Sequence, residues 1–146
     1  MTISLNLEEC TISGNSVSAA VCVLPPDARV TEELATAVLA LRPTLAEHAC
    51  KQQGMGYFGD RIVGATLPHL VEHLAIDLLV EEQRHRDGDN AGQTRSPRHA
   101  IAGTTTWLDR EQGRMRVRIS STAQNKEGVC TAITRAVALL NSLLDQ

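Results

Sequence analysis

Polar and apolar residues alternate with a period of two near the start of the chain. Ile3, Leu5 and Leu7 have polar neighbours, and a second alternation covers residues 17–23, after turn-forming residues at 13–15. Successive side chains of a β-strand point to opposite faces, so each stretch has one apolar face. The two stretches therefore predict a β-hairpin.

A second hairpin is predicted later in the chain, with strands near residues 101–108 and 114–120. In its second strand Met115, Val117 and Ile119 fall on one face, which we expect to contact the core. The alternate positions hold three arginines: Arg114, Arg116 and Arg118. We expect these arginines to be solvated, although such a stripe would also suit a chain of carboxylates.

Three further stretches, about residues 30–42, 67–84 and 126–144, have apolar residues at helical spacing. Pro43 stops the first pattern, and Thr66 is a suitable N-cap for the second. In the second stretch the apolar residues form two nearly opposite arcs, so we expect that helix to be buried on more than one side.

Two segments between these elements have the composition of loops. Residues 52–64 are rich in glycine, which favours a shaped loop, and residues 85–99 are polar and rich in turn formers, which favours a long mobile loop. The order ββααββα predicts one α+β domain over residues 1–146. In it, a four-stranded antiparallel sheet packs against three helices in two layers.

Composition excludes several classes of function. The chain has 146 residues, a net charge of −3 and 2% aromatic residues, so it offers neither a general attraction to nucleic acid nor a platform for stacking bases. Its start lacks the pattern of a signal peptide, and its apolar stretches are shorter than a membrane span. We expect a cytoplasmic protein with no membrane partner, in which the four separated cysteines are reduced.

The segment HLVEH carries the most specific chemistry in the sequence. His69 and His73 are four residues apart on the second predicted helix, so their imidazoles can reach one metal ion, and zinc suits them best. Glu72 lies beside them, where a carboxylate can act as general base toward water. The pattern H-x-x-E-H is that of the inverzincin metallopeptidases. The alternative is a set of polar side chains that are merely solvated.

A catalytic zinc site needs a third protein ligand and a position left for water. The spacing leaves four residues open for this role: Glu127, Cys130, Cys50 and His48.

The stretch from Pro43 to Leu78 resembles the N-terminal domain of cyanophycin synthetase. Matching positions lie in an EHxC segment, a glycine-phenylalanine-arginine loop and the helix with the H-x-x-E-H motif. They are Glu47, His48, Cys50, Phe58, Arg61, Gly64, Thr66, His69, Glu72 and His73. The likeness continues more weakly through the second hairpin and the last helix.

The resemblance implies a domain that holds a growing aspartate and arginine polymer. In some members it also carries a metallopeptidase-like zinc site that clips the polymer. It implies zinc ligands at His69 and His73, with Glu72 as the catalytic residue. Glu127 falls where the family has acidic residues, which makes it the preferred third ligand. Expected partners are a peptide or Asp/Arg-type polymer, a ligase encoded separately, and a second copy of this chain as a homo-oligomer.

Three hypotheses follow. The first is a zinc-dependent hydrolase of peptide-like substrates. The second is a non-catalytic accessory domain that binds a polymer or a partner, because residues 121–126 replace most of the family's acidic run. The third is a zinc lyase or isomerase of the S-ribosylhomocysteine lyase type, in which Cys130 would be the later cysteine ligand.

Overall fold

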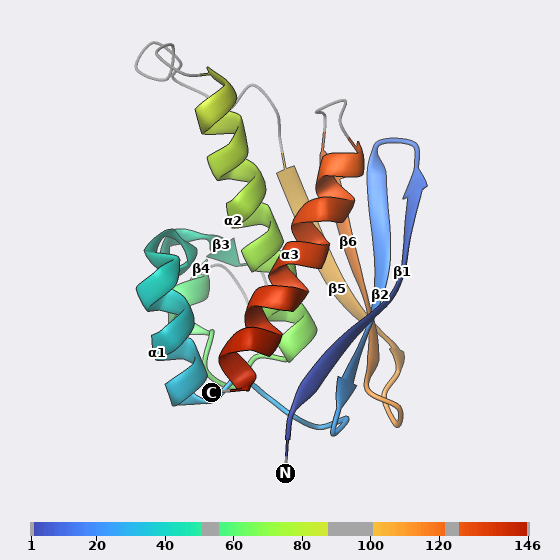
Figure 1. Ribbon diagram of the computed structural model, residues 1–146, viewed down its shortest axis with the longest axis vertical. Helices are drawn as coiled ribbons and strands as arrows, with labels where there is room; N and C mark the ends of the chain where they lie inside the picture. The colour runs from blue at the N-terminus through green and yellow to red at the C-terminus, as the bar shows by residue number, and fades with distance from the viewer. Residues whose placement is uncertain (1, 51–55, 88–100, 122–125, 146) are drawn as a thin grey trace.

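Four antiparallel strands and three α-helices form the main body of the protein (Figure 1). The computed structural model describes residues 2–50, 56–87, 101–121 and 126–145. The elements in order are β1 (Ser4–Ser13), β2 (Ser16–Leu24), α1 (Glu32–Leu41), the 3₁₀ helix η1 (Pro43–Glu47), β3 (Ala49–Cys50), β4 (Gly56–Tyr57), the 3₁₀ helix η2 (Phe58–Asp60), α2 (Leu67–Asp87), β5 (Ile101–Asp109), β6 (Arg114–Ser121) and α3 (Lys126–Leu144). The predicted fold class is confirmed.

The sheet has the strand order β1-β2-β6-β5, so the two predicted hairpins pair through β2 and β6. The alternation in β6 has the predicted result, because Val117 and Ile119 are buried while Arg116 and Arg118 are exposed. Helices α2 and α3 contact each other most, and on the sheet α2 contacts mainly β5 and β6 while α3 contacts mainly β1 and β2. Figure 1 shows the two helices side by side on the same face of the sheet.

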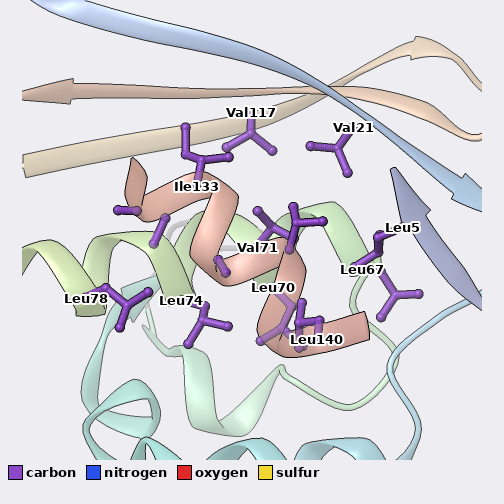
Figure 2. Packing of buried hydrophobic residues seen from close by; sticks show 14 of the residues in the cluster. Leu5, Val21, Leu67, Leu70, Val71, Leu74, Leu78, Val117, Ile133 and Leu140 are labelled. Carbon is purple, nitrogen blue, oxygen red and sulfur yellow. The ribbon is translucent and has the colours of Figure 1, made fainter. Parts of the chain in front are cut away.

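Helix α2 is buried on two sides, as its sequence predicts. One side carries core residues that pack with α3 and the sheet (Figure 2): Leu67, Leu70, Val71, Leu74 and Leu78. The helix begins at the predicted cap, where the hydroxyl of Thr66 accepts a hydrogen bond of 3.2 Å from the backbone N–H of His69. Its other side faces η1 and β3 and carries buried polar residues.

Two boundaries differ from the sequence prediction. Helix α1 starts at Glu32 rather than near residue 30, because Thr31 is extended and the N–H of Val30 donates to the carbonyl of Ala65 at 2.9 Å. Thr31 then caps the helix through its hydroxyl, which accepts from the N–H of Leu34. The predicted loop at 85–99 is helical as far as Asp87, and residues 88–99 lie outside the described residues.

Helix α3 meets the length and composition of a membrane span, alone among the described helices. Its apolar side is buried against α2, β1 and β2, through Val129, Ile133, Ala136 and Leu140.

Candidate metal centre

Three side chains from β3 and α2 meet in a small buried group, which we call the ligand cluster: Cys50, His69 and His73. Their ligand atoms all lie within 4.8 Å of one another. The Nε2 atoms of His69 and His73 are 3.2 Å apart, and Sγ of Cys50 is 3.9 Å from Nε2 of His69. All three residues are at most 5% exposed. The cluster can therefore hold a metal ion.

Cys50 is held in place by its backbone as well as by burial. It pairs with Gly56 in the short β3–β4 ladder, and its carbonyl accepts a 2.9 Å hydrogen bond from Nη1 of Arg61. A Cβ atom on Gly56 would lie 2.7 Å from Nη2 of Arg61, so a larger residue there would displace the end of this guanidinium. The glycine and arginine of this loop thus position the cysteine.

Phe58 covers the two histidines from the β4 side. Its ring stacks on that of His73 at a centroid distance of 4.0 Å and meets that of His69 edge-on at 5.3 Å. Phe58 is fully buried, so the imidazoles lie between a hydrophobic ring and the body of α2. This arrangement limits the rotation of both rings.

The histidines are held in the neutral form that a metal ligand requires. Burial lowers the pKa of His69. Burial, together with the charges of His69 and His48, lowers the pKa of His73 to about 3. Neutral imidazole keeps a lone pair for coordination.

Glu72 lies next to the ligand cluster without being part of it. One carboxylate oxygen accepts a 2.6 Å hydrogen bond from the hydroxyl of Thr105, and the other is 3.8 Å from Nε2 of His73. Burial raises the pKa of Glu72, and the Thr105 hydroxyl and the charge of His48 partly offset that rise. The carboxylate is therefore more basic than an exposed glutamate.

Behind His73 lies a polar network that links η1 to α2. His48 is 3.3 Å from His73 between their Nδ1 atoms, and its Nε2 is 3.1 Å from Oδ1 of Asp77. Asp77 also accepts hydrogen bonds from Nε of Arg42, at 2.7 Å, and from the hydroxyl of Thr44. Burial raises the pKa of Asp77, but these three donors outweigh it and bring the pKa to about 2. Asp77 is thus a carboxylate.

The ligand cluster opens into a cavity of about 1270 Å³ between α2, η1 and β5. Ile76 and Val80 line it together with His69 and His73. Residues 101–106 of β5 line it consecutively, so the strand borders the cavity with its edge rather than with one face.

The structure separates the four residues considered for the third ligand. Cys50 is in the ligand cluster, and His48 lies outside it, with its Nδ1 3.3 Å from Nδ1 of His73. Glu127, the residue preferred on family grounds, is exposed in the first turn of α3 and is not in the cluster. Cys130 hydrogen-bonds with Cys10 of β1, and this bond adds to the burial that raises the pKa of the Cys10 thiol to about 12. The geometry therefore favours Cys50.

Gly103 on β5 lies so close to Glu72 that the two residues constrain each other. A Cβ atom at residue 103 would be 2.8 Å from Cγ and 2.9 Å from Oε2 of Glu72. We expect Gly103→Ala to lower the free energy of unfolding by about 1–3 kcal/mol, because the carboxylate must move. Urea unfolding of the variant measures this cost, and the exposed neighbour Thr104→Ala should change stability by less than about 0.5 kcal/mol.

A double-mutant cycle identifies the source of that cost. In a Glu72→Ala background the clash is removed, so Gly103→Ala should then be nearly neutral. An equal cost in both backgrounds would contradict the packing described above.

Comparison with known proteins gives one match. A family model described as cyanophycin synthase-like N-terminal domain matches residues 25–145, which include every described element from α1 to α3. No curated protein and no solved structure matches the chain. The match agrees with the resemblance seen in the sequence.

Proposed function

Because the chain belongs to the cyanophycin synthase-like N-terminal domain family, we propose that it is a zinc-dependent hydrolase that cleaves amide bonds in a polymer. The observation that carries this proposal is the ligand cluster with Glu72 beside it. Imidazole and thiolate are zinc ligands, and a basic carboxylate beside them can take a proton from metal-bound water.

The donor types and two of the three distances between ligand atoms support zinc as the metal. Two nitrogen ligands at about 2.0–2.1 Å from a tetrahedral zinc ion are about 3.3 Å apart, and the Nε2 atoms of His69 and His73 are 3.2 Å apart. A sulfur and a nitrogen ligand would be about 3.6 Å apart, and the observed distance from Cys50 to His69 is 3.9 Å. Thiolate and imidazole also select zinc over magnesium or calcium.

The protein side chains have distinct parts in the reaction. A bound zinc ion supplies a Lewis acid that polarises a carbonyl group and makes water more acidic. Glu72 takes a proton from the attacking water and returns it to the amine nitrogen as the C–N bond breaks. Thr105 fixes one carboxylate oxygen, which leaves the other turned toward the ligand cluster.

The outer position of β5 beside the cavity favours an extended polymer as substrate. β5 is the outer strand of the four-stranded sheet, so its backbone groups on the side away from β6 pair with no other strand of the described chain. An extended main chain can add to such an edge and run along the cavity past Glu72. The family suggests an Asp/Arg-type polymer, cyanophycin, as the first substrate to test. We propose a cytoplasmic location for this activity.

The test uses tag-free protein and variants of single side chains. With zinc added, Glu72→Gln should retain the metal and lose polymer cleavage by about 10²–10⁴-fold, because only the proton acceptor is removed. Cys50→Ser and His69→Ala should lose both metal and cleavage, and Glu127→Gln should keep both. Metal content by elemental analysis and release of short peptides provide the two measurements.

An accessory domain without catalysis is the second candidate. Among the described residues, every buried side-chain nitrogen or oxygen has a hydrogen-bond partner, so the centre can hold together without a metal. Zinc-loaded wild type that binds the polymer and cleaves none of it would favour this candidate over the hydrolase. Loss of zinc in Glu127→Gln, but not in Cys50→Ser, would instead restore Glu127 as the third ligand.

The lyase hypothesis requires Cys130 as a metal ligand. The thiol of Cys130 instead hydrogen-bonds with that of Cys10 on β1.

A further inference from the structure

We propose that Asp77, acting through His48, fixes the tautomer of His73 so that its Nε2 lone pair faces the ligand cluster. His48 and Asp77 are thus positioning residues that set which nitrogen of His73 can hold a metal. The inference rests on the proposed function in one respect, which is that His73 is a metal ligand.

The chain of hydrogen bonds starts at a group that can only accept. Asp77 is ion-paired with the guanidinium of Arg42, 2.6 Å from Nη2 to Oδ2, and its other oxygen accepts from Thr44. An ionised carboxylate has no proton to donate. Nε2 of His48, 3.1 Å from Oδ1 of Asp77, must therefore carry the proton of that hydrogen bond.

The proton on Nε2 of His48 also determines which of the next two nitrogens donates a hydrogen bond and which accepts it. An imidazole that is neutral and carries its proton on Nε2 has a lone pair on Nδ1, so His48 in its neutral form accepts at Nδ1. The partner there is Nδ1 of His73 at 3.3 Å, which must then be the donor. His73 is left with a lone pair on Nε2, the atom that lies 3.2 Å from Nε2 of His69.

Metal-binding histidines commonly donate their second N–H to a carboxylate or a carbonyl, which fixes the tautomer and strengthens the ligand. Here a second imidazole stands between the ligand and the carboxylate. The hydrogen bonds from Asp77 through His48 to His73, which we call the relay, also join the two walls of the cavity. His48 lies on the segment after η1, and Asp77 lies one turn beyond His73 on α2.

Asp77→Asn tests the relay by reversing it. The new amide can donate to Nε2 of His48, which moves the His48 proton to Nδ1 and leaves His73 protonated on Nε2. In metal-free protein labelled with ¹⁵N-histidine, wild type should show the Nδ1–H tautomer of His73 at neutral pH, and Asp77→Asn the Nε2–H tautomer. Zinc affinity, measured by competition with a chromophoric chelator, should fall about 10–100-fold in the variant.

Matched variants separate the relay from a general loss of structure. Thr44→Val removes another donor to the same carboxylate and should change neither tautomer nor zinc affinity. His48→Leu should lose affinity, and His48→Asn should recover part of it, because its amide oxygen can accept from His73. These two variants carry the test if Asp77→Asn does not fold.

The Nε2–H tautomer of His73 in wild type, or equal zinc affinity in Asp77→Asn, Thr44→Val and wild type, would overturn the inference. These measurements do not depend on hydrolysis. A protein with the expected tautomers that cleaves no polymer would refute the proposed function and leave the relay standing.

Discussion

Replacing Phe58 by alanine is expected to lower the free energy of unfolding by about 3–5 kcal/mol and zinc affinity by about 10–100-fold. The ring is fully buried and stacks on His73 at 4.0 Å, so its removal leaves a cavity beside the imidazoles and frees them to rotate. Urea unfolding of the metal-free variant measures the first effect, and chelator competition measures the second.

Leu140 on α3 provides the control for this prediction. It is fully buried and does not line the cavity, so Leu140→Ala should lose about 2–5 kcal/mol of stability with little change in zinc affinity. Equal zinc affinities in Phe58→Ala and Leu140→Ala would mean that Phe58 acts on stability alone.

Metal-free protein is expected to lose about 2–3 kcal/mol of unfolding free energy between pH 6.5 and pH 4.5. The pKa of His73 falls from its ordinary 6.5 to about 3 on folding, chiefly through burial, and that of His69 is also lowered. In this pH range the unfolded chain binds protons that the folded protein does not. This contribution to stability is therefore complete above pH 6.5 and is lost as the pH falls.

Glu72 makes a smaller contribution of opposite sign in the same range, because burial raises its pKa above the ordinary 4.5. The Glu72→Gln variant should therefore show a steeper dependence on pH than wild type, and His73→Gln a flatter one. Urea unfolding at several pH values with chelator present is the measurement. A wild-type stability that is constant or rises toward pH 4.5 would show that the histidines are not held neutral.

Local patterns were enough to predict the sheet and the helices. The strict alternation of residues 114–119 could place only one face of β6 on the core, and the two apolar arcs of α2 required contacts on two sides. Boundaries were less accurate where a tertiary contact decided them. The bridge between Arg29 and Thr66 keeps the chain extended up to Thr31, and the local sequence gives no sign of it.

The two histidines and Glu72 were visible in the sequence because they lie on one helix with a fixed period. Cys50 was not singled out, because its position depends on how η1 folds back along α2 and on the ladder between β3 and β4. One signal was available. His48 and Cys50 are two residues apart in an extended segment, so their side chains point to the same side. Two potential ligands on the same side of an extended segment are expected to face the same neighbouring element.

Thr105 and Asp77 could not be assigned from the sequence alone. Thr105 is one of three consecutive threonines, and only the register of β5 against β6 determines which of them faces α2. Asp77 resembles any acidic residue on a helix until Arg42 and His48 are seen beside it.

Four of the five buried polar residues among those described lie on α2: His69, Glu72, His73 and Asp77. The same helix supplies the middle of the core, so a substitution there that changes the size of a side chain also disturbs the packing of the core. Divergence toward a new substrate would therefore fall on β5, where no described residue is fully buried, while the helix would be inherited nearly unchanged.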